Sequence, residues 1–301
     1  MPSLPFVTLD VFTNERFQGN PLGLVKLSKD HDISTEQMQT IAKEFNLSET
    51  VFLHEGMVGD DGVTEWSVRI FLTEGEVPFA GHPMIGTACY ALGTLANNAS
   101  KGRLLCKAGP IQVDYSNELA KASIPHNVHI HTQADFTEKQ LYELQPALDH
   151  PDRAPTEIDV VSPVKGMSFV CVQLRSLEAL SAVRMSRKPT AKLDEGWDVG
   201  FVGSYFYAVA RQDDGSMKLR TRMIEGSFED PATGSASCAL GALLTLKHKW
   251  RNASFSITQG VEMGRKSDIT VDVMLVGDLT AVEEIILGGS AIKVMEGEIH
   301  Y

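Results

Sequence analysis

The feature that most constrains the fold is an internal repeat of two apolar segments. HPMIGTACYALG, which begins at His82, aligns with DPATGSASCALG, which begins at Asp230, when their prolines are superposed. Each copy has the composition of a helix with almost no polar face, and a helix that is apolar all round must be buried all round. The repeat therefore predicts two similar units, each with a sheet wrapped around one apolar helix.

Runs with strand character surround each copy of the repeat, among them FVTLDVFT and WSVRIFL in the first half and MSFVCVQL and MKLRTRMI in the second. Capping boxes predict two further helices, one after Ser34 and one after Thr137. The segment SIPHNVHIHTQADFT is interpreted as a linker between the halves.

The pattern predicts an α+β fold of two pseudo-symmetric domains, each a curled mixed β-sheet or barrel around a central apolar helix. The predicted bounds are residues 1–124, completed by a C-terminal strand at about 286–301, and residues 125–285.

Length and charge agree with a two-domain enzyme and limit its partners. The chain has 301 residues, and domains of about 150 residues are common. Its 27 basic and 39 acidic residues give a net charge of -12, which argues against nucleic acid or an anionic membrane as a partner. We expect a cytoplasmic protein, because the N-terminus lacks the pattern of a signal peptide and no apolar run approaches the length of a spanning helix.

The starts of the two apolar helices are suited to binding an anion. A proline would occupy the first helical position of each, with His82 or Asp230 before it, and Gly81 would allow close approach of the backbone. Helix N-termini present N–H groups that bind carboxylates, and Gly234 and Ser235 would do the same if the second helix starts later. Asp230 has the alternative role of a simple N-cap, and His82 that of a packed capping residue.

Glu49 is the third group of interest. The run FNLSETVFL places it between a helix and an apolar strand, where Glu is a poor β-former. It is either an exposed connector or a carboxylate at the edge of an interdomain cleft. With His82 and Asp230 it would form an acid/base set for moving protons on carbon. No metal is required, because N–H groups would hold the carboxylate of the substrate.

Several strings, taken in order, resemble the PhzF-like proteins, the phenazine-biosynthesis isomerase family that is related in fold to diaminopimelate epimerase. They are DVFTNERFQGNPLGLV, FNLSETVF, VPFAGHPMIGTA, EDPATGSA and QGVEMGR, and the match runs from about Leu9 to the last strand. The resemblance implies a cofactor-free and metal-free isomerase that acts on a small carboxylated metabolite and forms a homodimer.

The resemblance also implies the roles of individual residues. Glu49 would be the general acid/base that moves a proton between carbons, assisted by His82 and Asp230. The substrate-binding residues would be Asn20, Ser48, Gly81, Gly234 and Ser235. Departures from the family pattern at Leu72, at Lys266 and in the segment RMIEGSFEDP concern the substrate more than the chemistry.

Three other interpretations remain open at this point. One is an amino-acid epimerase or racemase of the diaminopimelate type, which would use a pair of cysteines. Cys89 and Cys238 do not align with each other, however, and each follows its proline by about two helical turns. Another is a metal site on His126, His129 and His131, which lacks an evident fourth ligand. The last is a non-catalytic small-molecule-binding protein of the same fold.

Overall fold

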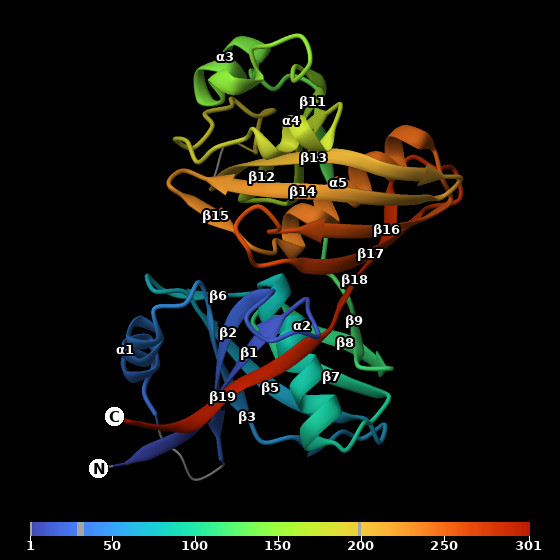
Figure 1. The fold of residues 1–301 in the computed structure, drawn as a ribbon. Helices are drawn as coiled ribbons and strands as arrows, with labels where there is room; N and C mark the ends of the chain where they lie inside the picture. The colour runs from blue at the N-terminus through green and yellow to red at the C-terminus, as the bar shows by residue number, and fades with distance from the viewer. Residues whose placement is uncertain (1, 29–32, 198–199) are drawn as a thin grey trace. The chain divides into compact units, whose positions relative to one another are not determined.

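The computed structural model describes residues 2–28, 33–197 and 200–301. The chain divides into two compact units, one formed by Met1–Ile124 with Leu287–Tyr301 and the other by Pro125–Ile286 (Figure 1). No helix in these described ranges is long and apolar enough to cross a membrane. The fold is of the α+β class, dominated by sheet.

The first unit contains two α-helices and a short π-helix among its strands. The helices are α1 (Thr35–Phe45), α2 (Gly81–Tyr90) and the π-helix η1 (Ala91–Leu95). The strands are β1 (Ser3–Val11), β2 (Asn20–Leu27), β3 (Thr50–His54), β4 (Met57–Val58), β5 (Thr64–Phe71), β6 (Glu76–Val77), β7 (Lys101–Cys106), β8 (Gly109–Ser116), β9 (Leu119–Ser123) and β19 (Ala291–His300).

The second unit is also dominated by strands, with one long helix, α5, among shorter ones. Its helices are α3 (Glu138–Leu144), the 3₁₀-helix η2 (Pro146–Leu148), α4 (Leu177–Ser181) and α5 (Gly234–His248). Its strands are β10 (His129–His131), β11 (Pro155–Val164), β12 (Met167–Leu174), β13 (Phe201–Asp213), β14 (Ser216–Glu225), β15 (Phe228–Asp230), β16 (Asn252–Gln259) and β17 (Ser267–Leu275). Strand β18 (Val282–Gly289) spans the boundary between the two units in sequence.

The two units follow the same path through their sheets. In the first, β1–β2, β3–β5 and β7–β8 pair antiparallel, whereas β2–β3 and β5–β7 pair parallel. In the second, β11–β12, β13–β14 and β16–β17 pair antiparallel, whereas β12–β13 and β14–β16 pair parallel. Short strands β6 and β15 pair with β5 and β14, just before the apolar helix of each unit. The sequence repeat is thus also a repeat of topology.

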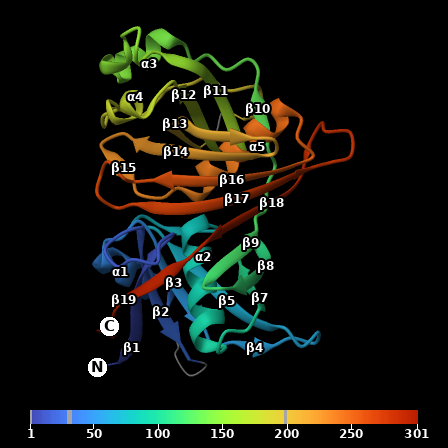
Figure 2. The same ribbon diagram turned by 45° about the vertical axis from the view of Figure 1, so that its right-hand side comes forward.

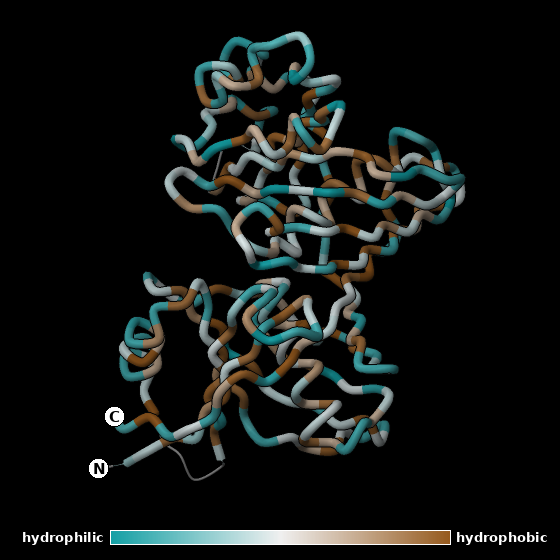
Figure 3. The backbone as a smooth tube through the Cα atoms, in the orientation of Figure 1, coloured by the Kyte–Doolittle hydropathy of each residue, from teal (hydrophilic) through white to brown (hydrophobic). Residues whose placement is uncertain are grey.

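Each apolar helix lies at the centre of its own unit (Figure 2). Every residue of α2 from His82 to Tyr90 is buried, and the helix packs against β1, β2, β3, β7, β8, β9 and β19. Helix α5 packs against β11, β12, β16 and β17. Figure 3 shows apolar residues along the strands that surround α2. The expectation that both helices are buried all round is confirmed.

Close packing around α2 depends on Gly86. A Cβ atom at this position would lie 2.7 Å from methyl groups of both Leu22 and Val11, so the absence of a side chain lets β1 and β2 approach the helix.

The predicted capping boxes are confirmed, and the predicted helix starts are corrected. Ser34 and Thr137 cap α1 and α3, each with a glutamine three residues later. Pro83, however, is the third residue of α2 and not its first. A proline is tolerated there because the first turn has no intrahelical N–H bonds to lose.

The start of α5 also differs from the expectation. Asp230 pairs with Met223 at the end of β15, so the backbone is still extended there and the helix cannot begin at Pro231. Helix α5 begins at Gly234, with Thr233 as its N-cap. The alternative role of Asp230 as the N-cap is therefore wrong. Part of the predicted linker forms β10, because His129–His131 pairs with β11.

A buried ion pair holds β15 against β14. Arg222 donates from Nε and Nη2 to the two carboxylate oxygens of Glu229 at 2.8 and 2.7 Å, and from Nη1 to the carbonyl oxygen of Val183 at 2.7 Å. The side chains are 6% and 9% exposed. Because both charged side chains are shielded from water, each needs the opposite charge of the other to offset the cost of its burial.

We expect Glu229→Gln and Arg222→Met each to lower the free energy of unfolding by about 3–5 kcal/mol, since each leaves a buried charge without its partner. The double variant should cost less than the sum of the two. Urea unfolding monitored by fluorescence measures these differences. As a matched control, Glu143→Gln removes one charge of the exposed Arg187–Glu143 pair and should have little effect. Strictly additive costs in the double variant would contradict the analysis.

Candidate active site

Glu49 lies at the entrance to a central strand of the first unit. Helix α1 is capped by Asn46, whose left-handed backbone (φ 51°) turns the chain back towards the sheet. Four residues later, at Thr50, the chain enters β3, which lies between β2 and β5. The Glu49 side chain is only 16% exposed. The interpretation of this residue as an exposed connector is therefore wrong.

His82 faces Glu49. The distance from His82 Nε2 to Glu49 Oε2 is 3.7 Å, and the histidine side chain is 6% exposed. On the other side of the ring, Asn20 Nδ2 lies 3.5 Å from His82 Nδ1. With the amide in this orientation Asn20 donates to Nδ1, and a neutral ring would then carry its proton on Nε2, the nitrogen nearer to Glu49.

The other residues predicted in the first unit are close to this pair along the chain. Gly81 is the first residue of α2 and His82 the second, so both belong to the turn whose N–H groups lack intrahelical acceptors. Ser48 precedes Glu49 and is exposed. Asn20, Glu49 and His82 are brought together by side-chain contacts, whereas Ser48 and Gly81 are placed there by their neighbours in sequence.

The second unit carries Asp230, Gly234 and Ser235. Asp230 ends β15, and its carboxylate accepts from the Thr233 hydroxyl at 2.6 Å and from the Ala232 N–H at 3.4 Å. Gly234 and Ser235 are the first two residues of α5. The second unit therefore places a carboxylate four residues before the start of its central helix.

A polar cluster beside this loop was not anticipated from the sequence. Gln259, the last residue of β16, is fully buried and contacts both Asp230 and Thr233. The sequence does contain a signal for this buried glutamine. Phe255 and Ile257 occupy inward-facing positions of β16, and Gln259 falls at the next inward-facing position of the same alternation. A polar residue in the core phase of a strand requires buried partners.

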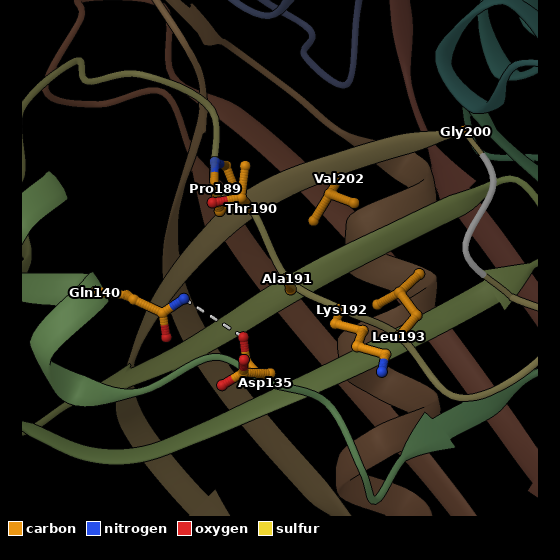
Figure 4. Close-up of a pocket in the computed structure, with 9 residues that line it drawn as sticks. All are labelled: Asp135, Gln140, Pro189, Thr190, Ala191, Lys192, Leu193, Gly200 and Val202. Atoms are coloured by element: carbon orange, nitrogen blue, oxygen red, sulfur yellow. Dashed lines mark hydrogen bonds between the residues drawn. The ribbon is translucent and has the colours of Figure 1, made fainter.

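Two cavities within the described units are lined by residues other than the predicted site residues. A cavity of about 380 Å³ in the second unit is bordered by Asp135, Gln140 and the segment 189–193. Figure 4 shows the Gln140 amide directed towards Asp135, whose carbonyl oxygen it contacts at 3.5 Å. Another cavity, of about 290 Å³ in the first unit, lies at the C-terminal end of α2 near Cys89 and Tyr115. Neither coincides with a cluster of acid/base groups.

Comparison with known proteins identifies the family. The family model for phenazine biosynthesis-like proteins, PhzC-PhzF, matches residues 9–297. The chain belongs to the PhzC-PhzF family. It is 33% identical to an uncharacterized isomerase of Mesorhizobium japonicum, over 99% of each chain. It is 28% identical to the trans-2,3-dihydro-3-hydroxyanthranilate isomerase of Pseudomonas aeruginosa, over 95% of this chain and 96% of that protein.

The fold agrees with this assignment. The PhzF-family phenazine biosynthesis protein of Bacillus anthracis superimposes with a TM-score of 0.73 over the full length of both chains, at 22% identity. The chain is therefore an isomerase of the PhzF family, with the fold that the sequence resemblance implied.

The histidines considered as metal ligands form a hydrogen-bonded cluster with Asp194. His129 Nε2 lies 2.9 Å from Asp194 Oδ2, and His131 Nδ1 accepts from the Asp194 N–H at 3.3 Å. The other nitrogen of His131 contacts Ser162 Oγ at 2.8 Å. The Asp194 carboxylate also accepts the backbone N–H of residues 132 and 133. Both ring nitrogens of His131 already have hydrogen-bond partners within the protein. The group of potential metal ligands found among the described residues is His129, His131 and Asp194, without His126.

The cysteines do not resemble a catalytic pair. Cys89, Cys171 and Cys238 are buried. Burial raises the pKa of Cys89 to about 12 and that of Cys238 to about 12, so both thiols keep their protons at neutral pH. A protonated thiol is neither a base nor a good nucleophile. This favours a structural role for both.

We expect native protein treated with iodoacetamide at about pH 8 to be alkylated at Cys106, which is partly exposed, and to leave Cys89 and Cys238 unmodified. Peptide mapping by mass spectrometry measures the modified fraction, with urea-unfolded protein as the control in which all four thiols react. Cys89→Ala and Cys238→Ala should keep most of the turnover. Rapid alkylation of either buried thiol in the native protein, with loss of activity, would favour the two-cysteine epimerase instead.

Proposed function

We propose that this protein moves a proton between two carbon atoms of a small carboxylated substrate, without a cofactor or a metal, and that Glu49 is the acid/base. The observation that supports this proposal most directly is the pair formed by Glu49 and His82. A carboxylate that is 16% exposed lies 3.7 Å from an imidazole nitrogen, at the first turn of a buried helix. Groups held in this way are suited to general acid/base catalysis.

The proposed reaction has two steps. The Glu49 carboxylate takes a proton from one carbon, so that a C–H bond breaks, an O–H bond forms, and the electron pair stays in the π system of the substrate. The protonated Glu49 then returns the proton to a second carbon, and the double bond moves accordingly. In this scheme His82, whose Nε2 lies 3.7 Å from Glu49 Oε2, would orient the carboxylate, and Asn20 would hold the imidazole from its other side.

The substrate carboxylate would bind to the N–H groups at the helix starts. Gly81 opens α2, and Gly234 and Ser235 open α5. The positive end of each helix dipole favours an anion there. We propose that the residues of both helix starts act on one substrate, with Asp230 assisting proton transfer.

The identity of the substrate follows only by analogy. The relative from Pseudomonas aeruginosa is named for the isomerisation of trans-2,3-dihydro-3-hydroxyanthranilate, a cyclic amino acid with a carboxylate and a mobile double bond. A compound of this class fits an anion site next to a carboxylate base. We propose it as the first compound to test, together with a panel of small cyclic and amino carboxylic acids.

We expect wild-type protein in D₂O to incorporate deuterium at one carbon of the true substrate, as observed by NMR. Glu49→Gln keeps the shape of the side chain but removes the base, so the rate should fall by about 10²–10⁴-fold. Substrate should still protect this variant against thermal unfolding, because the helix starts are unchanged.

The matched control is Glu55→Gln, the same chemical change at an exposed glutamate beyond the other end of β3. This variant should exchange deuterium at the wild-type rate. Near-normal exchange in Glu49→Gln would show that Glu49 is not the base. Thermal protection by ligands without any exchange in the wild type would identify a non-catalytic binding protein.

A further inference from the structure

We infer that Gln259 is a positioning residue for the proposed reaction, because its side-chain amide fixes both the carboxylate of Asp230 and the start of α5. The inference deepens the proposed function and depends on the role given there to Asp230. The hydrogen bonds that carry it lie within the second unit.

The end of β16 lies directly against the loop that follows Asp230. Gly260, the residue after Gln259, has a φ of +75°, which favours glycine. A Cβ atom there would lie 2.7 Å from the carbonyl oxygen of Pro231. Only glycine lets the two backbones approach this closely. This close contact between Gly260 and Pro231 holds the neighbouring Gln259 beside the loop.

Two backbone groups fix the orientation of the Gln259 amide. Its Nε2 donates to the carbonyl oxygen of Asp230 at 2.8 Å, and its Oε1 accepts from the N–H of Thr233 at 3.4 Å. A backbone carbonyl can only accept and a backbone N–H can only donate, so the reversed amide would lose both bonds. The side chain therefore bridges residues 230 and 233 across the turn that leads into α5.

This orientation determines where the Thr233 hydroxyl proton points. Gln259 Nε2 also donates to Thr233 Oγ1 at 2.9 Å, so the hydroxyl oxygen is an acceptor on that side. Its own proton is then directed to Asp230 Oδ2, at 2.6 Å. Gln259 thus orients the Asp230 carboxylate through one intervening hydroxyl group.

The far side of Gln259 is held by a buried tyrosine. Tyr205 is fully buried, and its hydroxyl donates to Gln259 Oε1 at 3.1 Å. Burial raises the pKa of Tyr205, so this hydroxyl remains a donor at physiological pH. The Tyr205 hydroxyl oxygen also lies 3.0 Å from the hydroxyl oxygens of Thr221 and Ser237, and Ser237 belongs to the first turn of α5. A connected buried network of this kind is rigid.

The expected consequence is a carboxylate that is oriented before the substrate arrives. Loss of the network should affect the reaction rate more than substrate binding, because small misplacements of a catalytic group lower kcat steeply. We expect Gln259→Leu and Thr233→Val each to lower kcat by about 10- to 100-fold, with a KM within about threefold of the wild type. Thr233→Ser, which restores the hydroxyl, should recover most of the rate.

The control variant is Gln173→Leu. Gln173 also accepts a hydrogen bond from a tyrosine, Tyr207, at 3.3 Å within the same unit, but none of its hydrogen bonds reaches the loop at Asp230. It should leave kcat unchanged. All rates are measured by deuterium exchange, well below the melting temperature of each variant.

Combination with Asp230→Asn separates positioning from a general effect on the fold. If Gln259 acts through Asp230, then Gln259→Leu should cause no further loss of rate in the Asp230→Asn background. An additional loss of the same size there would overturn the inference. A normal kcat for Gln259→Leu beside an inactive Asp230→Asn would also overturn it, while leaving the proposed function intact.

A second measurement does not require a substrate. Backbone amide hydrogen exchange at residues 232–235 should accelerate in Gln259→Leu and remain unchanged in Gln173→Leu. Unchanged exchange at these residues would refute the inference even if no substrate were found. Wild-type turnover in Asp230→Asn would instead refute the role proposed for Asp230, and the positioning role would fall with it.

Discussion

Burial of two helices that have no polar side is the constraint on which the rest of the structure depends. Neither α2 nor α5 has a polar face to present to water, so each sheet has to curve around its helix. The polar groups of such a helix are concentrated at its ends. Gly81 and Gly234 therefore mark the places where each unit can present main-chain N–H groups to an anion.

The two units share a scaffold but not their chemistry. In the first, an imidazole at the helix start is held by Asn20 and faces Glu49. In the second, a carboxylate precedes the helix and accepts from the Thr233 hydroxyl, which in turn accepts from the buried amide of Gln259. The residue immediately before β13, which corresponds in topology to β3, is Gly200, whereas the residue immediately before β3 is Glu49. At this one position only the first unit has a titratable side chain.

Local signals in the sequence predicted most of the fold. The capping box at Ser34 and the apolar repeat depend on neighbours within a few residues, and the structure has both as expected. The start of α5 was misplaced because Pro231 is a common first residue of a helix, whereas Asp230 is held in β15 by pairing with Met223 of β14. Gln259 was missed for a similar reason, since its partners are 26 to 54 residues away in sequence. Tertiary contacts decide such positions, and local patterns carry little information about them.

Closure of the first unit sets the order in which the chain can mature during synthesis. Strand β1 pairs along its length with β19. One edge of β1 therefore has no pairing partner until residues 291–300 have been synthesised. The whole second unit is made in between, and domains generally fold as units while the ribosome is still working. The unit that contains Glu49 is therefore the last to become complete, and in a nascent chain its sheet is not closed until β19 has been translated.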